Sequence, residues 1–149
     1  MGVIKRYKNL NERVGKYFIA YEFSCPHCGE CLIDTNLVEL LDNIREKIKS
    51  PLIITSGFRC EEHNKKIGGA PKSKHLLGIA SDIIAPKLTV KELFRITENI
   101  LGNRGGLGYY PARGFIHIDT RKEAVRWHEI KFGVYLPLTQ EKKKLLGLA

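Results

Sequence analysis

Apolar residues recur every three or four positions in two segments of the chain, which is the spacing of an amphipathic helix. The first segment, residues 34–50, begins with an Asp-Thr pair, and either side chain can cap the first turn. In the second, residues 89–102, Thr89 and Glu92 have the spacing of a capping box, and Gly102 follows the last apolar position. Both segments are therefore predicted to be helices that bury one face.

Shorter apolar runs, rich in β-branched and aromatic residues, predict strands. They lie between turn-forming residues at 51–57, 78–84, 106–110, 114–119 and 132–138. The first of these is expected to be a buried strand. Residues 60–69 predict a brief helix that ends at a Gly-Gly pair, and residues 111–114 predict the turn of a hairpin. This pattern favours an α+β fold, with a small, mainly antiparallel sheet and helices packed on one side.

The composition fits one globular domain spanning residues 1–149. The chain is 43% hydrophobic, so a core of ordinary size can form without disulfide bonds. No run approaches the roughly 18 apolar residues that a membrane span needs, and charges interrupt the N-terminal segment where a signal peptide would be apolar. We therefore expect no membrane insertion and a protein that is cytoplasmic as synthesised.

The formal net charge is +9, and lysine pairs and the tail at residues 141–146 contribute much of the excess. A basic surface suits an anionic partner such as nucleic acid or a bacterial wall polymer. An ordinary solvated surface accounts for the same charge. The sequence carries no signal for an oligomeric state.

Two of the predicted strands each place a polar group among apolar neighbours. Side chains alternate between the faces of a strand, so Asp82 shares a face with Ala80 and Ile84, while His117 shares one with Phe115 and Asp119. A buried carboxylate is costly unless it meets a cation, hydrogen-bond donors or a metal. Asp82 is therefore a candidate ligand.

His75 lies in the loop before the strand that carries Asp82, seven positions earlier. Together with His117, these residues supply the three nitrogen and oxygen ligands that catalytic zinc sites commonly use, which leaves a fourth position open. A loop histidine beside a hydrogen-bonded aspartate explains the same spacing, so the spacing alone does not decide.

Three motifs in order resemble those of the zinc D-alanyl-D-alanine carboxypeptidase family, peptidoglycan peptidases that share a metal-binding fold with the hedgehog signalling domain. Residues 56–59 match Ser-Gly-aromatic-Arg, residues 73–82 match Ser-x-His-x-x-Gly-x-Ala-x-Asp, and His117 ends a later strand. The resemblance covers roughly residues 20–128. It implies that His75, Asp82 and His117 bind a catalytic Zn²⁺.

The resemblance also implies an activity and further site residues. The expected function is hydrolysis of peptide bonds in peptidoglycan stem peptides, at a D-alanyl-D-alanine end or within a cross-bridge, in the manner of a phage lysin that acts on the wall after release. Arg59 would bind the oxyanion or a substrate carboxylate, and Ser73 would order the ligand loop or contact substrate. Tyr109 or Tyr110 would form a wall of the substrate groove.

The sequence departs from the family pattern at the general base. Gly114 and Phe115 stand where many members carry an acid or a second histidine. Asp119, on the same strand face as His117, is the candidate base or the carboxylate that orients this histidine. If Asp119 instead pairs with Arg121 or Arg126, the alternative is a zinc-binding wall or protein-interaction module with weak or no activity.

Four cysteines lie in the first half of the chain, at Cys25, Cys28, Cys31 and Cys60. They suit a second, structural zinc ion, a disulfide from Cys60 to one of the others, or free thiols. With the basic charge, a cysteine knuckle also suits nucleic-acid binding. That hypothesis ranks behind the peptidase because it leaves His75, Asp82 and His117 without a role.

Overall fold

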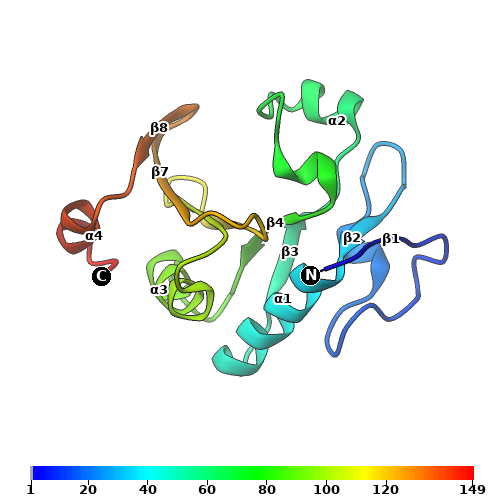
Figure 1. The fold of residues 1–149 in the computed structure, drawn as a ribbon, viewed down its shortest axis with the longest axis horizontal. Coiled ribbons are helices and arrows are strands. Elements are labelled where there is room, and N and C mark those ends of the chain that lie inside the picture. Colours follow the sequence, from blue (N-terminus) through cyan, green and yellow to red (C-terminus); the bar gives the residue numbers. More distant parts are fainter. Residues whose placement is uncertain (1) are drawn as a thin grey trace.

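The computed structural model of the chain describes residues 2–149 (Figure 1). In chain order its elements are β1 (Ile4–Arg6), the 3₁₀ helix η1 (Ala20–Phe23), β2 (Leu32–Asp34), α1 (Thr35–Ile48), β3 (Ile53–Ser56), α2 (Glu61–Lys66), the 3₁₀ helix η2 (Lys74–Leu77), β4 (Ala80–Ile84), α3 (Val90–Leu101), β5 (Gly106–Tyr110), β6 (Phe115–Asp119), β7 (Val125–Lys131), β8 (Val134–Pro137) and α4 (Gln140–Leu146).

Six strands form the main sheet in the order β3-β4-β6-β5-β7-β8. All neighbouring pairs are antiparallel except β5 and β7, which run parallel. Strands β1 and β2 form a separate antiparallel ribbon. The expected class, α+β around a mainly antiparallel sheet, is confirmed.

The two long helices begin where their capping residues predict. Asp34 caps α1 by accepting a hydrogen bond from the backbone N–H of Asn36 at 3.1 Å. Thr89 and Glu92 form the reciprocal capping box of α3. Helices α1 and α3 contact each other, and α3 also packs on β5 and β6, so both cover the same side of the sheet (Figure 1).

The structure differs from the predicted elements in two ways. Strand β3 is the edge of the sheet rather than a buried strand, and Ile53 is 43% exposed. Strands β1, β2 and β7 and helix α4 had no clear pattern in the sequence. β7 carries polar residues on both faces, since Arg126 donates to Glu98 and Glu129 accepts from Arg113. Helix α4 is too short and too lysine-rich to show an apolar stripe.

Within residues 2–149, none of the helices combines the length and the apolar character that crossing a membrane requires.

Candidate metal centre

A single row of residues crosses the sheet at the level of the site. Asp82 of β4 pairs directly with His117 of β6, and Ser56 of β3 pairs with Asp82 on the other side. On β5, Gly108 pairs with both His117 and Trp127 of β7. Residues paired in register share one face of a sheet, so the fold presents these side chains together.

Gly108 leaves room within this row for the indole of Trp127. A Cβ atom at position 108 would lie 2.5 Å from Cε2 of Trp127, which is closer than such contacts occur. The indole packs against His117 with ring centroids 5.1 Å apart. No local sequence signal singles out Trp127, because the pattern of β7 does not predict a strand.

His75 reaches the same point from η2. The Ser73 hydroxyl caps this short helix by accepting a hydrogen bond from the backbone N–H of His75 at 3.2 Å. The Nδ1 atom of His75 lies 2.7 Å from the carbonyl oxygen of Gly57. A carbonyl only accepts, so Nδ1 carries the proton and Nε2 presents its lone pair.

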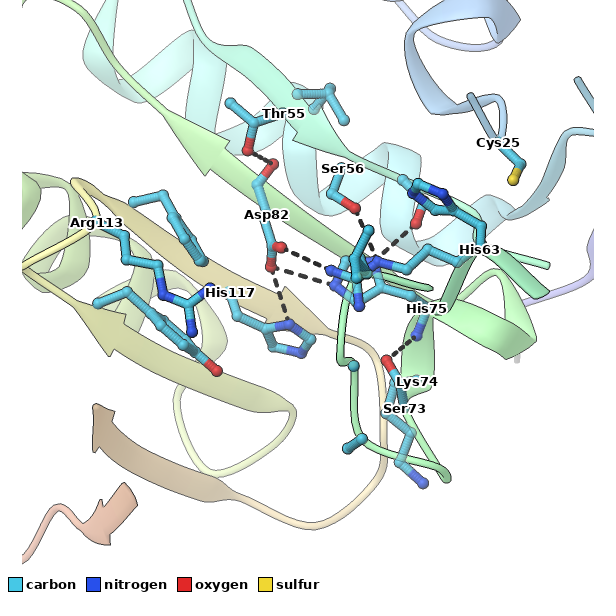
Figure 2. Close-up of a pocket in the computed structure, with 18 of the residues that line it drawn as sticks. Cys25, Thr55, Ser56, His63, Ser73, Lys74, His75, Asp82, Arg113 and His117 are labelled. Atoms are coloured by element: carbon cyan, nitrogen blue, oxygen red, sulfur yellow. Dashed lines mark hydrogen bonds and ion pairs between the residues drawn. The ribbon is translucent and has the colours of Figure 1, made fainter. Parts of the chain in front are cut away.

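The three predicted ligands converge on one point (Figure 2). Oδ1 of Asp82 lies 3.2 Å from Nε2 of His75 and 3.1 Å from Nδ1 of His117. One ligand atom from each residue lies within 4.8 Å of the other two, and all three residues are buried. The sequence placed these side chains on three separate segments, and the structure brings them together.

Asp119 lies behind His117, on the ring edge away from Asp82. Its Oδ2 is 2.8 Å from Nε2 of His117, and Arg121 donates to both carboxylate oxygens at 2.7 and 2.6 Å. Burial would raise the pKa of Asp119, but His117 and Arg121 outweigh it and hold this pKa below its ordinary value. The ionised carboxylate accepts the Nε2 proton, so in the neutral imidazole Nδ1 of His117 faces Asp82 with its lone pair.

Burial acts differently on the three converging groups. It would raise the pKa of Asp82, but the attraction of His75 and the bond to His117 prevail, and the pKa lies below its ordinary value. Burial lowers the pKa of His75, which favours the neutral imidazole. For His117 burial is outweighed by the bonds to Asp119 and Asp82, and its pKa is raised.

These residues fit a divalent metal ion. Two imidazole lone pairs and an anionic oxygen converge on one point. The N–H on the other nitrogen of each ring donates to the Gly57 carbonyl or to Asp119. Such a cluster of acceptors requires a proton or a cation between them. A metal-ligating histidine normally donates its other N–H to a carbonyl or carboxylate, as both histidines do here.

Arg59 extends from the turn after β3 to the ligand Asp82. Its guanidinium donates to Asp82 Oδ2 at 3.2 Å and to Ser56 Oγ at 3.1 Å, and also to Asn64. The backbone N–H of Arg59 donates to the carbonyl of His75. Burial lowers the pKa of the Arg59 guanidinium. Arg59 therefore orients one candidate ligand, Asp82, and supports the loop of another, His75.

A cleft of about 1540 Å³ opens over the converging ligands. The side chains that line it include those of Arg59, Ser73, Tyr110, Arg113, Trp127 and Tyr135. Tyr110 stacks on Phe115 and accepts a hydrogen bond from Trp127 Nε1 at 2.9 Å. Tyr109 points the other way, into the core against Phe94, because neighbouring side chains of a strand alternate. Of the two tyrosines expected at the groove, Tyr110 therefore lines the cleft and Tyr109 does not.

Three of the four cysteines form a second cluster, and Cys31 is not part of it. One sulfur each from Cys25, Cys28 and Cys60 lies within 4.8 Å of the others, whereas Cys31 is a core residue whose thiol donates to the Ala20 carbonyl. Burial raises the pKa of Cys31 to about 11. Burial would also raise the pKa of Cys25, but hydrogen bonds from backbone N–H groups lower it to about 7. All four thiols are free.

Residues 16–119 match the family described as peptidase M15. The peptidoglycan L,D-endopeptidase MepK of Escherichia coli K12 is 30% identical over 95 residues, which cover 59% of this chain and 51% of MepK. The protein of the same name from Shigella flexneri matches to the same extent. The chain thus spans about half the length of the curated relatives it matches.

Proposed function

Because the chain belongs to the peptidase M15 family, whose peptidases are metal-dependent, we propose that it is a zinc-dependent endopeptidase that cleaves stem peptides of bacterial peptidoglycan. The observation that carries this proposal is the convergence of His75, Asp82 and His117 beneath an open cleft. Two imidazoles and one carboxylate are the ligand set of many catalytic zinc sites.

When bound there, Zn²⁺ would polarise the scissile carbonyl and lower the pKa of water toward neutral pH. The chain supplies the orientation. Gly57 and Asp119 hold the imidazole protons away from the metal, and Arg59 holds the carboxylate of Asp82. Each ligand is thereby fixed in its binding orientation before substrate arrives.

Arg59 also supports substrate binding. Three of its five N–H groups donate to Ser56, Asn64 and Asp82, which leaves two for the cleft that it lines. These groups are suited to the oxyanion that develops during hydrolysis or to a substrate carboxylate. In this proposal Ser73 orders the ligand loop, because its hydroxyl caps η2.

The size of the cleft favours an endopeptidase over a carboxypeptidase. Pockets for small ligands occupy roughly 300–1000 Å³, and this cleft is larger at about 1540 Å³. Aromatic and basic side chains at Tyr110, Arg113 and Tyr135 extend it beyond the ligands. A net charge of +9 suits a polyanionic wall. The endopeptidase activity named for the relative MepK points in the same direction.

One observation favours a second candidate, a metal-binding wall module without activity. Asp119 is held by Arg121 and His117, so this carboxylate is not free to act as a general base. Among the described residues that line the cleft, the carboxylates are Glu22 and Asp82, and both are already hydrogen-bonded. In the peptidase, the proton would then pass to solvent or to a cleft residue other than these carboxylates.

The test is digestion of purified peptidoglycan and soluble stem peptides by the zinc-loaded chain, with the products identified by mass spectrometry. We expect cleavage within the peptide, lost in His117→Ala and Asp82→Ala and retained in His128→Gln, which lies outside the site. Release of terminal D-alanine alone would instead indicate a carboxypeptidase. Bound zinc without any product would establish the non-catalytic module.

A further inference from the structure

The thiols of Cys25, Cys28 and Cys60 lie beside the turn that carries Arg59, and the proposed peptidase chemistry does not use them. Their sulfur atoms form a group within 4.8 Å, and the sulfurs of Cys25 and Cys60 are 3.7 Å apart. Cys25 is buried, Cys60 is half-buried and Cys28 is exposed. The group therefore has one side open to solvent, through which an ion can enter.

The separation of the sulfurs fits a shared metal ion rather than a disulfide. Bonded sulfurs are about 2.05 Å apart. Thiolates bound to one tetrahedral zinc at about 2.3 Å lie roughly 3.8 Å from each other. The 3.7 Å between Cys25 and Cys60 matches the second value.

The local backbone builds the group from two segments. Residues 25–30 form a closed turn, because the N–H of Cys25 bonds to the carbonyl of Glu30 and the N–H of Gly29 bonds to the carbonyl of Cys25, both at 2.8 Å. Gly29 has a φ of 76°, a conformation that favours glycine and lets the chain reverse directly after Cys28. Both cysteines of the turn thus face Cys60.

Backbone N–H groups point at two of these sulfurs. The N–H of Cys60 lies 3.5 Å from the sulfur of Cys25, and the N–H of His63 lies 3.4 Å from the sulfur of Cys60. Such donors stabilise thiolates, which are the form that binds a metal. Cys31 lacks this environment, since its thiol donates to a carbonyl in the core.

We propose that Cys25, Cys28 and Cys60 bind a structural Zn²⁺, distinct from the ion held by His75, Asp82 and His117. Thiolates select zinc over the hard cations that prefer oxygen ligands. No histidine nitrogen joins the group of ligand atoms within residues 2–149, so the three thiolates are the ligands that the described residues supply.

The proposed ion would join the 25–30 turn to the turn at residues 57–60. This second turn carries Arg59 and the Gly57 carbonyl that receives the proton of His75. The N–H of Phe58 already bonds to the carbonyl of Phe23, just before the cysteine turn. The thiolate site thus stabilises the backbone behind the candidate catalytic centre, and its presence does not depend on the proposed peptidase activity.

The experiment measures the zinc content of the purified chain and its variants by inductively coupled plasma mass spectrometry. In the double variant His75→Ala/His117→Ala, we expect about one zinc per chain to remain and to be lost when Cys28→Ser is added. Cys28 is exposed, so this change leaves the core intact. Cys31→Ala, which alters a core cysteine outside the group, should leave the zinc content unchanged.

Cobalt substitution of the otherwise unaltered protein provides a second measurement if the double variant does not fold. Thiolate-to-cobalt charge transfer gives intense near-ultraviolet absorption that an imidazole and carboxylate site lacks. We expect this band in the wild type and in Cys31→Ala, and its loss in Cys28→Ser. Zinc content and absorption that do not respond to Cys28→Ser would overturn the proposal. An intact mass two hydrogens lower under non-reducing conditions would do so too, by revealing a disulfide.

Discussion

Arg121 donates a hydrogen bond to each carboxylate oxygen of Asp119, from Nε at 2.7 Å and from a terminal nitrogen at 2.6 Å. The same carboxylate accepts the Nε2 proton of His117 and the backbone N–H of Gly106. This arrangement favours the second of the two roles open to Asp119 from the sequence, the orientation of a ligand histidine rather than proton abstraction. The Asp119–Arg121 ion pair, which from the sequence alone favoured an inactive protein, is therefore compatible with an active peptidase.

Replacing Asp119 with alanine should weaken zinc binding by about 10–100-fold, because His117 loses the acceptor that fixes its tautomer. Competition with a chromophoric chelator measures this affinity. Glu141→Ala, which removes an exposed acid of α4, is the control and should bind zinc normally. Unchanged affinity with reduced activity would instead identify Asp119 as the base.

The metal-free protein should lose stability as the pH falls through the acid range, in part because of Asp119. Its pKa is lowered on folding, so its bonds to His117 and Arg121 contribute fully above the unfolded pKa of about 4 and are lost below it. Asp119→Asn should therefore show a shallower fall in the free energy of unfolding between about pH 5 and 3. Urea denaturation of the chelator-treated protein measures this slope, and parallel curves for the two proteins would contradict the assignment.

Gly108→Ala should destabilise the fold by about 1–3 kcal/mol, because the added methyl group clashes with the indole of Trp127. Displacing this indole also removes its packing against His117. Urea denaturation gives the free energy of unfolding. In a Trp127→Leu background, the smaller side chain leaves room for the methyl group, so the same substitution should cost less. Equal costs in both backgrounds would show that the indole is not the obstacle.

Arg59→Lys should lower kcat/KM on stem peptide by about 10–100-fold although the charge is kept. A lysine cannot donate to Ser56, Asn64 and Asp82 at once. The control is Arg95→Lys at an exposed position of α3, which should retain full activity. Equal rates for Arg59→Lys and wild type would show that a point charge suffices at this position.

Elements with a strong local signal were predictable from the sequence. The caps at Asp34 and Thr89 and the apolar period of the helices they begin are properties of the nearest neighbours in the chain. The family was predictable because the motifs at 56–59 and 73–82 are contiguous and ordered. The match over residues 16–119 confirms it. Strand β7 escaped prediction because polar residues on both its faces remove the alternation that marks a strand.

The site itself required contacts between distant segments. The sequence by itself determined which residues offer metal-binding chemistry, His75, Asp82 and His117, and that alternation aims two of them out of strands. Only the tertiary structure decided that β4 and β6 pair in the register that sets Asp82 opposite His117, and that Arg121 engages Asp119. Cys31 likewise enters the core instead of the thiol group. The physical reason is that side-chain identity and strand period are local, whereas strand register and the choice of ion-pair partner depend on how the whole core packs.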